Sequence, residues 1–197
     1  MKPESSSSSY ELRFIQAGVD ELKDYLLSDQ IYWPVKIRAT SGKPAYPPLT
    51  LGTLELFLHQ AQALAADTEL RSEVNRINSE ILAIRSRWEV HCEQKAGTEF
   101  RARIKLWRDF LEEYRRDPEG NYDRYSFEVS RRAMLLWLQQ AATGLPAAEL
   151  QLLENLDRFH LSIFKPGAFI WDEELQNGFP KDIYWFLYGN LPKEWSS

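Results

Sequence analysis

The sequence feature that most constrains the fold is a run of apolar residues between positions 70 and 88 whose spacings alternate between four and three. Its members are Leu70, Val74, Ile77, Ile81, Ile84 and Trp88. A period close to 3.5 residues per turn is typical of a long helix that packs along a nearly parallel or antiparallel neighbour. The run therefore predicts a long, coiled-coil-like helix with at least one other helix beside it.

Four further segments carry the apolar stripe of a helix. They are residues 51–65 with Thr50 as the N-cap, 100–114 with Thr98 as the N-cap, 122–138, and 150–163 after Pro146. A shorter pattern at residues 19–26 predicts a first helix, and Lys95 with Gly97 predicts the end of the helix that begins near residue 70. Whether residues 51–95 form one helix or two stays open, because the stripe changes phase at residues 66–68.

Two segments depart from the helical pattern. Residues 35–39 alternate apolar and polar side chains, which predicts a strand, and residues 12–15 are its candidate partner in a two-stranded ribbon. Residues 168–197 place many aromatic residues among glycines and prolines. Because each aromatic side chain buries about 150–250 Å², we expect this segment to dock as an irregular strap. The predicted fold class is mainly all-α: an antiparallel bundle of about five long helices, with a minor N-terminal helix and β-ribbon and an aromatic C-terminal strap.

Length and composition fit a single domain. With 197 residues, 44% of them hydrophobic, the chain can bury a core without disulfides or a structural metal. Residues 1–9 are rich in serine and are expected to form a disordered tail, which leaves residues 10–197 as one helical domain. The single cysteine, the lack of a signal-peptide core and the lack of an apolar run of about 18 residues predict a cytoplasmic protein without a membrane partner.

Charge along the chain bears on nucleic-acid binding. The net charge is −5, but residues 101–132 hold a dense basic set with aromatic residues between its members. Arginines and stacking side chains can hold single-stranded nucleic acid, and the candidates are Arg101, Arg103, Lys105, Arg108, Arg124, Arg131 and Arg132. Acidic residues fill the same stretch, however. A solvated face of paired charges is therefore the favoured interpretation, and nucleic acid is not the expected partner.

Three histidines raise the question of a metal site. His59, His91 and His160 fall on three different predicted helices. If they converge, three neutral imidazoles could hold one divalent metal with an open position for catalysis. Glu55 lies four residues before His59 and is a further candidate ligand. The favoured interpretation is simpler: His59 pairs with Glu55, His91 is a hydrogen-bonded residue of the long seam, and His160 is a charge at the surface or at a helix end.

No motif for a known chemistry is present. The sequence has no phosphate-binding glycine loop, no dinucleotide fingerprint, no nucleophile elbow and no paired-cysteine metal spacing. We therefore predict a non-catalytic helical protein, without a cofactor, that acts through a protein partner or through self-association. A metal-dependent enzyme and a nucleic-acid binder are the alternatives, and no catalytic residue is assigned. Aromatic residues are enriched at interfaces, and the candidates there are Trp33, Trp171, Trp185 and Trp195.

Overall fold

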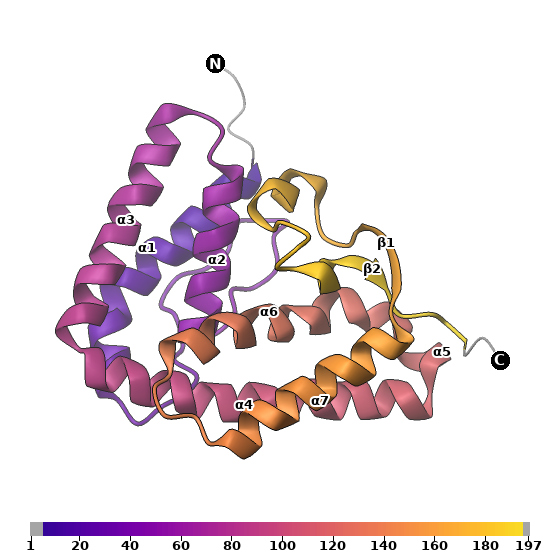
Figure 1. Ribbon diagram of the computed structural model, residues 1–197. Helices are drawn as coiled ribbons and strands as arrows, with labels where there is room; N and C mark the ends of the chain where they lie inside the picture. Colours follow the sequence, from indigo (N-terminus) through magenta and orange to yellow (C-terminus); the bar gives the residue numbers. More distant parts are fainter. Residues whose placement is uncertain (1–5, 195–197) are drawn as a thin grey trace.

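Helices form most of the part of the chain that the computed structural model describes, residues 6–194 (Figure 1). They are α1 (Ser6–Leu27), α2 (Leu51–Leu64), α3 (Thr68–Arg87), α4 (Glu89–Arg116), α5 (Pro118–Asn121), α6 (Tyr125–Ala141) and α7 (Ala147–Ile163). Strands β1 (Lys165–Phe169) and β2 (Tyr188–Asn190) pair antiparallel, and 3₁₀ turns span Tyr122–Arg124, Glu173–Gly178 and Trp185–Leu187. The predicted mainly all-α class is confirmed. None of the helices within residues 6–194 combines the length and apolar character needed to cross a lipid bilayer.

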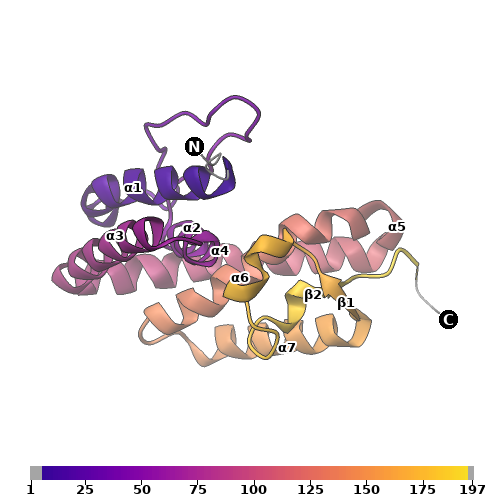
Figure 2. The ribbon, with the colours of Figure 1, turned by 90° about the horizontal axis from the view of Figure 1, so that it is seen from above.

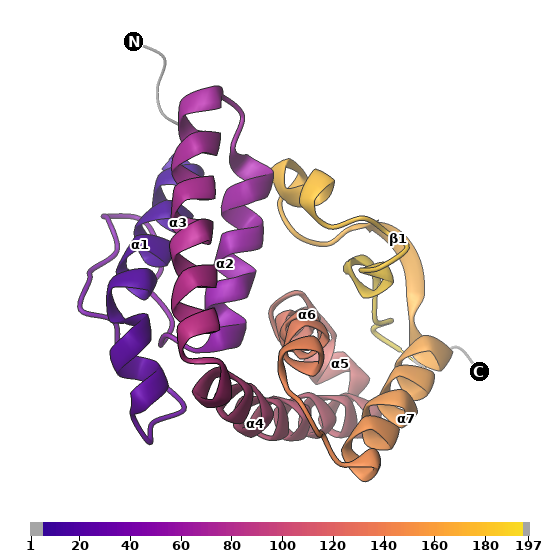
Figure 3. The ribbon, with the colours of Figure 1, turned by 60° about the vertical axis from the view of Figure 1, so that its left-hand side comes forward.

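The long helices fall into two groups that cross. Helices α1, α2 and α3 lie side by side in one group, while α4, α6 and α7 run together in the other (Figure 1, Figure 2). Helix α4 links the groups, since it contacts α6 and α7 and also α1, α2 and α3 (Figure 3). The two groups therefore meet where α2 lies against α4 and α6.

Helix α3 contains the predicted seam. Val74, Ile77 and Ile81 are buried, and α3 contacts α1 and α2. The helix begins after Asp67, whose carboxylate accepts a hydrogen bond from the Leu70 backbone N–H at 2.8 Å. Such an N-cap satisfies one of the free N–H groups of the first turn. Because α2 and α3 are separate, and α4 starts before residue 95, residues 51–95 hold two whole helices and the start of a third.

The predicted helix end at Lys95 and Gly97 is wrong, as is the predicted N-cap at Thr98, because all three residues lie inside α4. The chain changes direction earlier, at Trp88, whose backbone is non-helical (φ −117°, ψ 36°). The Lys95 ammonium group instead donates to the carbonyl oxygens of Ser28 and Gln30, each at 2.6 Å. These carbonyls follow the C-terminal end of α1, where partial negative charge favours a cation. Lys95 thus ties α4 to α1.

The predicted N-terminal ribbon is wrong. Residues 12–15 lie within α1, and residues 35–39 form no strand. Phe14 is fully buried and packs on Phe57 of α2, with ring centroids 4.2 Å apart. A short apolar run can belong to either a strand or a helix. Residues 12–15 are helical, and the helix is stabilised by the packing of Phe14 on α2.

Helix α1 begins earlier than expected and is followed by a long loop. It starts at Ser6, so residues 6–9 belong to it instead of to the expected disordered tail. Residues 1–5 lie outside the described range. After α1, an isolated bridge joins Trp33 to Leu49, and the backbone N–H of each donates to the carbonyl of the other at 3.0 and 2.7 Å. The bridge closes the loop just before α2 begins.

The C-terminal segment docks on both groups of helices, since it contacts α2 as well as α6, in agreement with the predicted strap. Phe179 and Phe186 are fully buried, and the Tyr125 hydroxyl of α6 donates to the Phe186 carbonyl at 2.5 Å. The two-stranded ribbon of the described chain lies here, as β1 and β2. Within it Gly189 has a φ of +153°, and a Cβ there would lie 2.2 Å from the Lys165 carbonyl oxygen. Glycine is therefore required at this crossing of the two strands.

A buried ion pair joins the two groups of helices. Glu99 of α4 is fully buried, and its carboxylate accepts hydrogen bonds from the Gly52 backbone N–H of α2 at 3.1 and 3.2 Å. Arg103 donates to the same carboxylate at 2.5 Å and to the hydroxyl of Thr50, the predicted N-cap of α2, at 2.9 Å. The carboxylate thus lies at the positive end of the α2 dipole. A Cβ on Gly52 would lie 2.7 Å from the carboxylate, so this close approach requires glycine.

Removing the buried carboxylate is expected to destabilise the fold. Glu99→Ala leaves the Arg103 guanidinium buried without its charged partner, which lowers the free energy of unfolding by about 3–5 kcal/mol. The control is Glu112→Ala, because Glu112 pairs with exposed arginines of α4, and this change is expected to cost less than about 1 kcal/mol. Urea unfolding followed by circular dichroism measures both variants, and equal losses would refute the role given to Glu99. If Glu99→Ala does not fold, Glu99→Gln, which keeps one acceptor oxygen, is expected to show a smaller loss.

Candidate functional site

A groove of about 1080 Å³ opens where the two groups of helices meet. We call it the junction groove. Its lining comes from α1, α2, α4 and α6, from the loop before α2, and from residues 170–175 of the C-terminal segment. In Figure 3, α2 and the C-terminal segment lie on either side of α6. Binding sites often form at such junctions between packed units. The lining includes Tyr32, Leu56, Phe57, Arg103, Leu106, Phe127, Arg131, Met134, Trp171 and Asp172.

Helical periodicity places the lining side chains on one face of each helix. Along α6 they are Ser126, Phe127, Ser130, Arg131 and Met134, and along α2 they are Thr53, Leu56, Phe57 and Gln60. Residues three and four apart lie on the same side of a helix. Helix α6 therefore turns this face toward the groove, while its stripe of Tyr125, Val129 and Ala133 is fully buried in the core.

The groove contains large apolar side chains that solvent can reach. Phe127 of α6 is 70% exposed, and Leu106 of α4 and Tyr32 of the loop are exposed as well. Trp171 of the C-terminal segment is half-buried and donates its indole N–H to the Ser126 carbonyl at 2.8 Å. Exposed apolar side chains that gather in one place mark a binding surface, unlike exposed residues scattered singly. The junction groove is therefore suited to apolar groups of a ligand or partner.

Two arginines also line this groove. Arg103 belongs to the buried pair with Glu99 and also lines the groove. Arg131 extends from α6 and forms an ion pair with Glu128. Burial, together with the neighbouring charges of Arg103 and Arg124, lowers the pKa of Arg131 from its ordinary value. The groove thus combines apolar walls with two arginine side chains, each of which is paired with a carboxylate of the chain.

A smaller pocket of about 480 Å³ adjoins the groove. The two share the lining residues Ala45, Pro47 and Pro48. Arg38 and Lys43 of the same loop also line the smaller pocket. The cationic lining therefore continues from the groove onto the loop.

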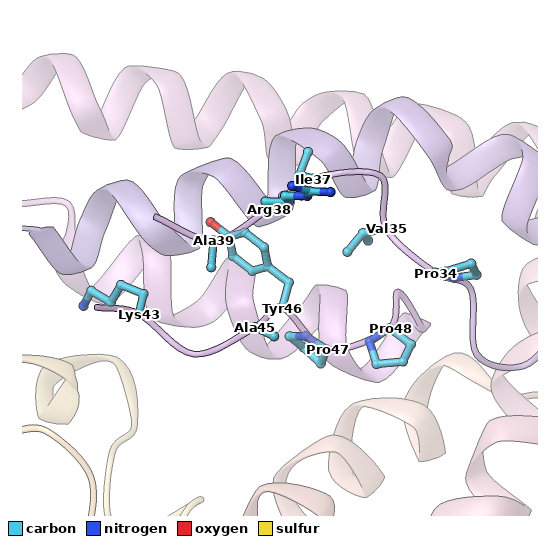
Figure 4. Close-up of a pocket in the computed structure, with 10 residues that line it drawn as sticks. All are labelled: Pro34, Val35, Ile37, Arg38, Ala39, Lys43, Ala45, Tyr46, Pro47 and Pro48. Carbon is cyan, nitrogen blue, oxygen red and sulfur yellow. The ribbon is translucent and has the colours of Figure 1, made fainter. Parts of the chain in front are cut away.

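The loop around this pocket is held on α1 by aromatic stacking. Figure 4 shows its two arms, residues 34–39 and 43–48, with the Tyr46 ring between them. The ring stacks on Tyr10 of α1 with centroids 4.4 Å apart, and the Tyr46 hydroxyl donates to the Tyr10 carbonyl at 3.2 Å. In return the Tyr10 hydroxyl donates to the Pro44 carbonyl at 3.2 Å. These contacts fix the position of the loop beside the groove.

The predicted pair of Glu55 with His59 is wrong. Glu55 forms an ion pair with Arg85 of α3. His59 Nε2 instead lies 3.4 Å from the Tyr184 hydroxyl, and its ring packs on Trp137 with centroids 5.4 Å apart. Burial lowers the pKa of His59. This imidazole is therefore part of an aromatic cluster between α2, α6 and the C-terminal segment.

His91 and His160 also differ from their predicted environments. His91 is exposed on α4, because the seam of α3 ends with the change of direction at Trp88. His160 is fully buried in α7 instead of forming a surface charge, and its Nε2 lies 2.9 Å from the Tyr125 hydroxyl. Within residues 6–194 no three His, Cys, Asp or Glu side chains gather in a way that could hold a metal ion. The candidate ligands His59, His91, His160 and Glu55 thus form no common metal site there.

Most of the candidate nucleic-acid arginines are paired with carboxylates. The pairs are Arg101 with Glu149, Arg108 with Asp109, Arg124 with Glu113, and Arg132 with Asp157. Arg103 and Arg131 have the partners described above, and Lys105 is exposed. Phosphate binding usually needs an unbalanced basic face. The pairing agrees with the favoured interpretation of matched charges for most of this set, although Arg103 and Arg132 are buried and do not lie on a solvated face.

The candidate interface tryptophans have different surroundings. Trp171 lines the junction groove. Trp33 is half-buried and donates its indole N–H to Glu21 at 2.5 Å, whereas Trp185 is half-buried and packs on His160 with ring centroids 4.9 Å apart. Trp195 lies outside the described residues. Partner binding by these residues stays a prediction.

Phe127, the most exposed large apolar residue of the groove, was missed by the sequence analysis. It lies off the buried stripe of its own helix, between Ser126 and Glu128. A large aromatic residue on an otherwise polar helix face is the signal that could have marked it. Leu106, within the predicted helix of residues 100–114, was not singled out either, and it is exposed at the groove.

Comparisons with protein-family models, with curated proteins and with solved structures find no match to this chain. Fold and groove together define its class: a mainly α-helical protein with an apolar and cationic groove at the junction of two helix groups. What the groove can bind follows from the geometry of its own residues.

The buried imidazole of His160 predicts a pH-dependent stability. Because the Tyr125 hydroxyl donates to the Phe186 carbonyl, a neutral ring protonated at Nε2 can donate to Tyr125, while Nδ1 has no partner for a second proton. Burial, and then the charge of Arg132, lower the pKa of His160 to about 3. The pKa in the folded state is thus below the ordinary value of about 6.5. Stability is therefore complete above about pH 6.5 and falls as the pH drops toward 3, by up to about 1.4 kcal/mol per pH unit.

Urea unfolding between about pH 5 and pH 7.5, where histidine titrates, measures this slope. We expect His160→Gln to reduce it, since an amide does not titrate. His59, whose pKa burial also lowers, contributes part of the slope that remains. His91→Gln, at an exposed histidine, is the control and should keep the wild-type slope. The same slope in His160→Gln and in the wild type would contradict the prediction.

Proposed function

We propose that the protein is a non-catalytic interaction module that binds a segment of a partner protein in the junction groove. The observation that carries this proposal is the exposed apolar surface of the groove, above all the 70% exposed ring of Phe127. Full burial of such a side chain contributes about 1.5–3 kcal/mol. A partner that covers Phe127 and Leu106 therefore gains affinity from these contacts alone.

The size of the groove is comparable to that of a short helix. A helix about 10 Å across fills about 1080 Å³ over about 14 Å, which corresponds to about nine residues. A segment of that length presents side chains at positions i, i+3 or i+4, and i+7 to a groove. A small-molecule pocket typically buries most of its ligand, whereas the lining here includes strongly exposed side chains. These features favour a helical protein segment as the occupant.

A selection of displayed random peptides of about 16 residues, carried out on the full-length protein, tests the proposal. Selected peptides are expected to bind Phe127→Ala about tenfold or more weakly than the wild type, which corresponds to about 1.4 kcal/mol. The reason is that their apolar side chains lose the Phe127 ring as a contact. Fluorescence anisotropy measures the affinities, and circular dichroism checks that the variant keeps its fold.

Leu161→Ala is the matched control, because Leu161 is 56% exposed on α7 and does not line the groove. The selected peptides should bind this variant with unchanged affinity. Failure to recover any binder, or binders that ignore the Phe127 change, would refute the proposal. Sedimentation velocity examines self-association: a wild-type dimer that Phe127→Ala dissociates would make a second copy of the chain the occupant instead of a partner protein.

A further inference from the structure

The charged groups that line the junction groove and its adjoining pocket are mostly positive. They are Arg38, Lys43, Arg103 and Arg131, against Asp172 as the acidic lining residue among those the structure describes. The chain as a whole has the opposite sign, with a net charge of −5. A positive lining on an acidic protein favours a partner that carries negative charge at this place.

The sequence concentrates positive charge in the loop beside the groove. Neither aspartate nor glutamate occurs between Asp29 and Glu55, whereas Lys36, Arg38 and Lys43 do. Lys36 reaches Glu21 of α1 at 3.8 Å. Glu11 of α1 is near enough to Lys43 for a favourable electrostatic interaction. The unbalanced positive charge on the loop is therefore greatest at Arg38, which is exposed.

Other arginines lie near Arg131, on the α6 side of the groove. Arg131 and Arg124 both pair with the carboxylate of Glu128, and Arg124 also pairs with Glu113. Arg103 is close enough that its charge disfavours the charge on Arg131. A carboxylate from a partner would relieve this repulsion, and charge-assisted hydrogen bonds of arginine to carboxylate are about twice as strong as neutral ones.

We infer that the partner segment is an acidic amphipathic helix. Its apolar side chains would pack on Phe127 and Leu106, and its carboxylates would face Arg131 and Arg38. The expected pattern is apolar residues at i, i+3 or i+4, and i+7, with aspartate or glutamate beside them. This inference rests on the proposed function and adds the charge of the partner to it.

Peptides recovered by the displayed selection serve as probes. We expect them to be enriched in aspartate and glutamate relative to the unselected library. From the tightest binder, two further versions are made in which every acidic residue is replaced by glutamine or by lysine. The glutamine version should bind at least about tenfold more weakly, and the lysine version more weakly still. The advantage of the acidic peptide should shrink as the salt concentration rises, because salt screens exposed charges.

Variants of the full-length protein locate the effect. Arg131→Gln should remove most of the difference in affinity between the acidic and the glutamine peptide. Arg116→Gln is the matched control, since Arg116 is 74% exposed on α4 and does not line the groove. Circular dichroism checks the fold. If Arg131→Gln does not fold, Arg38→Gln, at an exposed loop residue, provides the same comparison.

The outcomes distinguish this inference from the proposed function. Binders that depend on Phe127 but are neutral or basic overturn the acidic partner and leave the interaction module in place. If no binder depends on Phe127, both fail. A single-stranded oligonucleotide or oleate that competes more strongly than the acidic peptide also overturns the inference, because either would match the cationic lining without a protein partner.

Discussion

A carboxylate buried between two helices is the interaction on which the rest of this structure depends. Glu99 belongs to α4, yet it completes the hydrogen bonding at the amino end of α2 and binds Arg103 at the same time. A buried charge is tolerated when it is paired and hydrogen-bonded. Helices α2 and α4 therefore fit together in one relative position, and the two helix groups cross there. Because Arg103 also lines the junction groove, this pair connects the stability of the core with the charge of the candidate site.

The C-terminal segment forms one side of the groove, and polar contacts fix its position as much as apolar packing does. The Tyr125 hydroxyl donates to the Phe186 carbonyl, and the Tyr114 hydroxyl donates to the Pro192 carbonyl at 2.6 Å. Buried polar groups need such partners, so an irregular segment is held in one place. Trp171, near its beginning, is anchored on α6. The groove thus depends on the docking of this segment as well as on the crossing of the helices.

Features that depend on near neighbours were predictable, and those that depend on distant residues were not. The seam of α3 and the Thr50 cap follow from side chains three or four residues apart. The early start of α1 was missed, since Phe14 is recognisable as a helix residue only beside Phe57. Lysine is a residue typical of a helix end. The Lys95 side chain is instead buried inside α4, because its ammonium group donates to carbonyl groups that follow α1. The candidate site was harder to predict. Phe127 is exposed because no other part of the described chain packs over its face of α6, and this depends on where all the other elements lie.

The sequence by itself was enough to establish a mainly helical protein with an aromatic C-terminal segment. Helical stripes and turn residues are patterns of neighbouring residues, so they can be recognised without the tertiary structure. The stretch between residues 30 and 54 contains basic residues and no acidic ones, and this is equally a property of the sequence. The groove, its exposed ring and its paired arginines exist only in the folded chain. They require Gly52 to meet Glu99, and Trp171 to meet Ser126. Contacts between residues so far apart follow from the packing of all the helices together, for which no short stretch of sequence holds the information.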